Sequence, residues 1–264
     1  MLRQDEDWGV MRDPSRRADW SDELKYIPFG GREGWYLSVG GEARPYYERY
    51  RNEEWGSAPQ DLSGYFLQRY MLHADFHFGE RVRFFGQVKS GIETGKRGGP
   101  GPPDEDLLDV HQAFLDLAWS FSRERSLTLR AGRQELNYGS GRLISMREGP
   151  NVRQSFDGAG LMLRAGAWRV DGFVVKPVET DAGFFDDAAV SSHTVWGAYA
   201  VRPLPRLLPG GNIDLYYIGL DRRSARFDQG SEREIRQTVG TRLSGERRGW
   251  DYNAELVYQF GSFG

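Results

Sequence analysis

The chain contains no cysteine among its 264 residues. This absence excludes a disulfide scaffold and a metal site built on thiolates. There is also no run of about 18 consecutive apolar residues, which excludes a membrane protein built from spanning helices. Basic and acidic residues number 35 and 38, so the charge balance gives no reason to expect a nucleic-acid partner.

Several sequence signals of other protein classes are also missing. The N-terminal residues MLRQDED lack the basic-then-apolar pattern of a signal peptide, so if the protein is exported we expect its signal to be absent from this chain. Strand–helix alternation and helical periodicity are lacking, which argues against Rossmann and TIM-barrel folds. No GxSxG motif is present and no Ser–His–Asp order stands out. We therefore expect no enzymatic activity, no catalytic residue, no cofactor and no metal.

What the chain does have is an alternation of apolar and polar residues with a period of two. In residues 65–78 one parity is apolar, with Phe66, Tyr70, Leu72, Ala74, Phe76 and Phe78. The other parity is ionic, with Arg69, His73, Asp75 and His77. Successive side chains of a strand point to opposite faces. A soluble sandwich buries the apolar face in a core, whereas a membrane barrel turns it to lipid and lines a watery lumen with the polar face.

The same alternation repeats along the sequence and predicts about eleven strands. They cover residues 35–50, 65–78, 82–94, 108–121, 126–137, 155–165, 168–178, 193–203, 212–221, 234–245 and 250–263. The connections alternate between short ones and long ones, the long ones being 52–64, 95–106, 138–154, 179–192 and 222–233; the proline-rich stretch 203–211 fits this alternation less well. Short turns at one end and long loops at the other are typical of outer-membrane barrels.

Composition favours the membrane barrel over the sandwich. The chain has 8 Trp, 13 Tyr and 15 Phe, and bacterial barrels place such residues in girdles at the two membrane interfaces. The inner parity is charged and free of apolar residues, which does not suit a dry core. We therefore predict an all-β fold, an antiparallel up-and-down transmembrane β-barrel over residues 35–264. Residues 1–34 are predicted to form an irregular periplasmic lead-in segment.

One stretch carries a family signature. Residues 131–160 read AGRQELNYGSGRLISMREGPNVRQSFDGAG, and this segment closely resembles the signature of the alginate-export family of outer-membrane β-barrels. Further matching blocks are DEDW (5–8), LKYIP (24–28), YLSVGGEARPYYERY (36–50), FLQRYMLHADFHFGERVRFFGQVKSG (66–91) and DVHQAFLDL (109–117). The resemblance covers most of residues 5–178, and the order and spacing of the blocks fit as well as their content.

The resemblance implies a monomeric channel of the bacterial outer membrane with an arginine-rich constriction. Its cargo would be an anionic polysaccharide, an alginate-like polyuronate, or small anionic solutes. Basic residues within the matching blocks are the candidates for the anion pathway, namely Arg44, Arg69, Lys89, Arg130, Arg133, Arg142, Arg147 and Arg153. Arginine suits this role because its forked, always-charged guanidinium matches a carboxylate.

Acidic residues near these arginines are the candidates for counter-charges. They are Glu42, Asp75, Asp116, Glu135 and Glu148. The glycine-punctuated, charged connection 138–154 has two open interpretations. It folds toward the pore mouth and narrows it, or it is an ordinary charged extracellular loop.

Barrels of this family are larger, with about 18 strands, and bacterial barrels normally have an even count. We therefore expect the chain to represent the N-terminal part of a longer barrel, and a smaller closed barrel is the alternative. Three other functions stay open: a general or substrate-specific porin for other small solutes, a soluble carbohydrate-binding β protein, and a membrane-embedded enzyme using His73, His77 and Asp75. The partners we expect are outer-membrane lipid, the anionic cargo and periplasmic secretion proteins.

Overall fold

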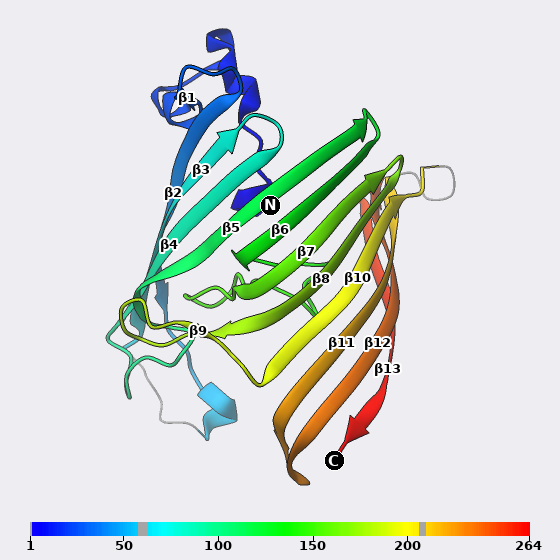
Figure 1. Ribbon diagram of the computed structural model, residues 1–264. Helices are drawn as coiled ribbons and strands as arrows, with labels where there is room; N and C mark the ends of the chain where they lie inside the picture. The colour runs from blue at the N-terminus through cyan, green and yellow to red at the C-terminus, as the bar shows by residue number, and fades with distance from the viewer. Residues whose placement is uncertain (1, 58–62, 206–209) are drawn as a thin grey trace.

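A computed structural model shows one curved antiparallel sheet, described for residues 2–57, 63–205 and 210–264 (Figure 1). Its strands are β1 (Ile27–Pro28), β2 (Trp35–Glu48), β3 (Tyr65–Phe78), β4 (Val82–Thr94), β5 (Asp106–Ser122), β6 (Arg125–Gln134), β7 (Phe156–Ala165), β8 (Trp168–Glu179), β9 (Ala188–Ala189), β10 (His193–Pro203), β11 (Gly211–Phe227), β12 (Gly230–Arg247) and β13 (Trp250–Phe263). Each long strand pairs with the next along the chain, which is up-and-down topology.

The predicted all-β antiparallel up-and-down fold is confirmed, and each predicted strand corresponds to one long strand. The sheet has 13 strands because it also contains β1, which pairs with β2, and β9, which pairs with β8. β2 and β13 lie on opposite flanks of the curved sheet and do not pair with each other within the described residues (Figure 1). The sheet described here is therefore open. The predicted connections 52–64 and 203–211 lie partly outside the described residues.

One predicted loop is wrong. Residues 222–233 are not a long connection, because β11 and β12 continue through them and turn only at Asp228 and Gln229. Cross-strand ion pairs such as Arg233 with Asp221 replace the apolar alternation that marks the rest of these strands. Gly230, at φ +138°, provides the backbone conformation that closes the hairpin. The polar composition had suggested a loop although the strands simply extend further.

The outward face of the sheet is an apolar belt. Residues of one parity on successive strands are large, apolar and exposed, among them Phe66, Leu72, Phe84, Leu115, Leu161, Val174, Leu215, Val239 and Leu256. Leu72 is 58% exposed and Leu256 is 73% exposed, which is a poor arrangement in water. Such a belt is stable against lipid tails. The alternation predicted from the sequence thus places its apolar parity on the outside.

The inward face is not free of apolar residues, so that prediction is wrong. Phe85 and Phe114 are fully buried there, and their rings stack at 5.2 Å between centroids. A second apolar cluster lies further along the sheet and contains Leu136, Ile144, Phe156, Phe173, Val175, Tyr199, Tyr216 and Ile218. Its members on β8, β10 and β11 pack against residues of the connection between β6 and β7. The inner face therefore combines apolar clusters with the charged residues.

The N-terminal region is built from short turns. They are the 3-10 turns η1 (Arg3–Asp5), η2 (Gly9–Arg12), η3 (Pro14–Arg16) and η4 (Trp20–Lys25), and a further turn, η5 (Glu53–Gly56), follows β2. Asp19 caps η4 in a reciprocal capping box with Asp22. Within the described residues, no helix has the length and apolarity needed to cross a bilayer. The lead-in segment is thus more ordered than the sequence suggested.

Candidate functional site: the lumen and its inward loop

The connection between β6 and β7, residues 135–155, folds against the inner wall of the sheet. Its first half is held by apolar contacts, since Leu136 and Ile144 are buried in the cluster described above. Tyr138 stacks on Phe173 at 5.3 Å and on Tyr199 at 4.9 Å between ring centroids. Of the two interpretations of this connection, the structure supports the one in which it folds inward. We call it the inward loop.

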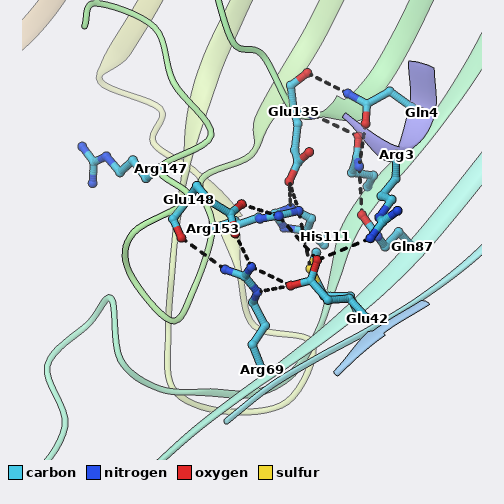
Figure 2. Close-up of polar contacts among 12 residues, drawn as sticks. Arg3, Gln4, Glu42, Arg69, Gln87, His111, Glu135, Arg147, Glu148 and Arg153 are labelled. Carbon is cyan, nitrogen blue, oxygen red and sulfur yellow. Dashed lines mark hydrogen bonds and ion pairs between the residues drawn. The ribbon is translucent and has the colours of Figure 1, made fainter. Parts of the chain in front are cut away.

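The tip of the inward loop is held by a charged network (Figure 2). Arg69 of β3 is only 2% exposed, and its Nη2 lies 2.6 Å from Glu42 Oε1 and 2.6 Å from Glu148 Oε1. Glu42 comes from β2 and Glu148 from the loop tip, so one guanidinium joins the wall to the loop. The buried charge is stabilised because both carboxylates satisfy it.

Two further arginines belong to the same network. Arg153, on the loop, pairs with Glu148 and lies 3.5 Å from Glu42 and 3.5 Å from Glu135. Arg44 of β2 donates hydrogen bonds to the backbone carbonyls of Glu148 and Pro150, at 3.0 Å each. The structure therefore brings together five of the residues predicted from sequence at the loop tip: Arg44, Arg69, Arg153, Glu42 and Glu148.

A second group forms a diagonal ladder along the wall nearer the short-turn end. Arg83 donates two hydrogen bonds to Asp75 at 2.7 and 2.8 Å, and Arg130 donates two to Asp116 at the same distances. Arg83 Nη1 also lies 3.6 Å from Asp116, which links the two pairs. The predicted Arg130, Asp75 and Asp116 thus lie in one cross-strand ladder. His77 extends it, with Nε2 lying 3.1 Å from Asp75 Oδ2.

Lys89 lies at the long-loop end of the wall. Its Nζ lies 2.8 Å from Asp106 and 2.7 Å from Asp187, and both carboxylates are fully buried. Asp109 lies close to both, so three acidic side chains surround one ammonium group. Lys89 therefore fixes the loop that carries Asp187 to the wall and does not face an open pathway.

The remaining predicted residues are dispersed. Arg133 pairs with Asp157 at 2.8 Å and donates a hydrogen bond to the carbonyl oxygen of Asp187 at 3.2 Å, so it borders the acidic group around Lys89. Arg142 pairs with Glu255 of β13 at 2.7 Å. Arg147 has an exposed side chain that points away from the network in Figure 2.

Sequence reasoning missed several lumen residues. His111 is fully buried and its Nε2 lies 2.8 Å from Glu135 Oε1. Strict alternation would turn His111 outward, but the register shifts between Gln87 and Val88, and this bulge turns it inward. Arg83 shares the inner parity of its strand with Lys89, so alternation does place it on the inner face, although it was not among the candidates for the anion pathway. Arg3, which lies 3.9 Å from Glu42, could not be placed in this way, since its segment has no strand periodicity.

The ion pairs of the loop tip have a predictable pH dependence. Burial opposes the charge of Glu148, but hydrogen bonds and charges from Arg69 and Arg153 outweigh it and hold the pKa of Glu148 below its ordinary value. Its contacts therefore stabilise the inward position fully above the pKa of the free carboxyl group and are lost as the pH falls through the lowered pKa. We expect a spin label on Arg147→Cys to become mobile only when the pH falls below the range in which a free glutamate carboxyl titrates, measured by electron paramagnetic resonance.

The matched control for this experiment is the same label in an additional Glu148→Gln background. That variant lacks the titrating carboxylate, so its label should be mobile across the whole pH range with no transition. A label that stays immobile down to pH values at which the carboxylates are protonated would contradict the role of these pairs.

The arrangement defines a class of protein. An up-and-down sheet with an apolar outward belt, a charged inner wall and an inward loop is the wall of an outer-membrane channel of the porin type. The sequence matches the family described as alginate export over residues 35–264, and the chain belongs to this family. Proteins of the family are transport channels of the bacterial outer membrane, and enzymatic activity is not their general role.

The comparison with solved structures gives a more distant similarity. The crystal structure of Pseudomonas aeruginosa OpdL is 16% identical in sequence, with a TM-score of 0.39, over 87% of this chain and 68% of that chain. No curated protein matches the sequence closely enough to count as a relative.

Proposed function

We propose that this channel passes an anionic polysaccharide of the polyuronate type, or small anionic solutes, through an arginine-lined constriction at the tip of the inward loop. The observation that carries the proposal is the gathering of Arg44, Arg69 and Arg153 around the loop tip. A uronate polymer has one carboxylate per sugar, which is the chemistry that a guanidinium recognises. The chain is proposed to act as a monomer in outer-membrane lipid and to receive its cargo from periplasmic secretion proteins.

The arginines differ in how available they are to a passing anion. Arg69 is buried, Arg153 is half-buried, and both are paired, so they hold the constriction in shape. The side chain of Arg44 is 26% exposed, and Arg147 is exposed at the same loop tip. Passage requires weak, repeated contacts and not one tight site. Arg44 and Arg147 are therefore the proposed contacts for the cargo, in a frame that Arg69 and Arg153 stabilise.

Removing these two exposed charges should reduce anion selectivity. We expect Arg44→Gln and Arg147→Gln, alone and together, to lower the anion-to-cation permeability ratio by about twofold or more, because each removes positive charge from a confined pathway. The measurement is single-channel current in planar bilayers under a salt gradient. Added polygalacturonate should block the wild-type current more strongly than that of the double variant.

Arg233→Gln is the matched control. Arg233 lies near the start of β12, in the hairpin with β11, where it pairs with Asp221, and its side chain is 54% exposed. It should leave selectivity and block unchanged. Anion selectivity that survives the double variant would contradict the proposed pathway. Equal passage of neutral sugars and anions would instead favour a general porin.

A further inference from the structure

A second segment enters the lumen, from the short-turn end. Gln4 is 2% exposed; it donates a hydrogen bond to the carbonyl oxygen of Glu135 at 3.2 Å and accepts one from Gln112 at 3.2 Å. Figure 2 shows Gln4 between these groups, with Arg3 directed toward Glu42. The N-terminal residues therefore meet the first residue of the inward loop inside the lumen.

The segment that follows Gln4 is acidic, and it borders a wall that carries several arginines. Asp5, Glu6 and Asp7 line a cavity of about 770 Å³ at the short-turn end. The lining also includes four arginines of the strands β4, β6, β7 and β8, together with Glu80 and Asp116; the arginines are Arg83, Arg130, Arg164 and Arg169. Arg83 and Arg130 are fixed by bidentate carboxylate pairs, so their positions do not depend on the acidic segment.

The acidic segment does not form close ion pairs with these arginines. Glu6 pairs with Arg3 at 2.8 Å, Asp7 accepts a hydrogen bond from the backbone of Gly9, and the side chain of Asp5 is exposed. Within the described residues, its attachment to the lumen rests on the neutral hydrogen bonds of Gln4 and on the approach of Arg3 to Glu42 at 3.9 Å. This attachment is weak compared with the charged network that holds the inward loop.

We propose that residues 2–8 are an intramolecular plug that occupies an anion-binding vestibule at the short-turn mouth, and that a polyanionic cargo displaces it. This inference rests on the proposed function and adds the site at which the cargo first binds. Asp5, Glu6 and Asp7 place three successive carboxylates at the vestibule. A polyuronate would place its own carboxylates, one per sugar, in the same position. The short-turn mouth is the periplasmic one in outer-membrane barrels, which is the side from which an exported polymer enters.

Accessibility of a single cysteine tests the displacement, because the chain has no native cysteine. We expect the Leu2→Cys variant of the full chain, refolded in detergent micelles, to react slowly with a maleimide, because Leu2 is half-buried and lines a pocket together with Gln4, whose hydrogen bonds this variant keeps. Saturating polygalacturonate should accelerate the reaction by about tenfold or more. Arg16→Cys, at an exposed position outside the lumen, should react at one rate with and without the polymer.

Affinity provides the second measurement. Asp5→Asn/Glu6→Gln/Asp7→Asn should bind polygalacturonate roughly threefold to tenfold more tightly than wild type in calorimetry, since the competing charge is gone. The control Glu23→Gln/Glu33→Gln/Glu124→Gln changes net charge equally through exposed residues that do not line the cavity, and should bind like wild type.

The outcomes separate the two proposals. Polymer binding with unchanged labelling of Leu2→Cys and unchanged affinity of the triple variant would overturn the plug and leave the proposed function standing. Absence of polymer binding by both wild type and the triple variant would overturn both.

Discussion

Arg69→Met is expected to destabilise the folded chain by about 3–5 kcal/mol and to release the tip of the inward loop. The guanidinium of Arg69 is buried and satisfies Glu42 and Glu148 together, at 2.6 Å from each. Methionine fills a similar volume without a charge, so Glu42 and Glu148 lose the guanidinium that they share and their negative charges repel each other. The free energy of unfolding, measured by urea denaturation in detergent micelles, checks this expectation.

Two variants make that result specific. Arg69→Met/Glu42→Gln should recover part of the loss, because it removes one of the two unpaired charges. Arg233→Met breaks an exposed pair and should cost less than about 1 kcal/mol. If Arg69→Met were no more harmful than Arg233→Met, Arg69 would not be holding the loop.

Lys89→Met is the second substitution with a large expected effect, again a loss of about 3–5 kcal/mol. Lys89 is the ammonium group between Asp106 and Asp187, whose side chains are fully buried. Without it, two carboxylates lie together in a dry environment and repel each other. The unfolding free energy should fall, and hydrogen exchange of the backbone around Asp187 should quicken, because the loop loses its attachment to the wall.

Lys176→Met is the matched control, since Lys176 donates only to the carbonyl oxygen of Ser191 in an exposed contact. It should leave both measurements nearly unchanged. Lys89→Met/Asp106→Asn should recover part of the stability. A Lys89→Met chain as stable as the Lys176→Met chain would show that the acidic group tolerates the loss of its cation.

The strands could be predicted from the sequence because lipid and lumen impose a period of two on every strand. Strand residues that lie beyond the lipid and the lumen do not need this alternation, so their strands cannot be predicted from it. β11 and β12 continue beyond the apolar belt, and residues there, such as Arg222 and Glu234, pair across the hairpin without any apolar alternation. Strand and loop have the same polar composition in such a stretch, so the sequence could not separate them.

Alternation predicts which side chains of a strand point to the inner face. It does not predict which residues those side chains pair with. Alternation turns Arg69 inward, but its partner Glu148 lies 79 positions away on a loop that has no period. A single shift of register turned His111 inward against the alternation. Gln4 was beyond prediction for a different reason, since a segment without regular structure offers no parity from which to place a side chain.

The base and the tip of the inward loop are attached by different kinds of contact. The two attachments should therefore respond differently to dissolved salt. The base is held by stacked rings and apolar contacts around Tyr138, which mobile ions do not weaken. The tip is held by ion pairs of a half-exposed Glu148, which mobile ions screen. We therefore expect the tip of the inward loop to loosen as the ionic strength rises, while its base stays in place on the wall.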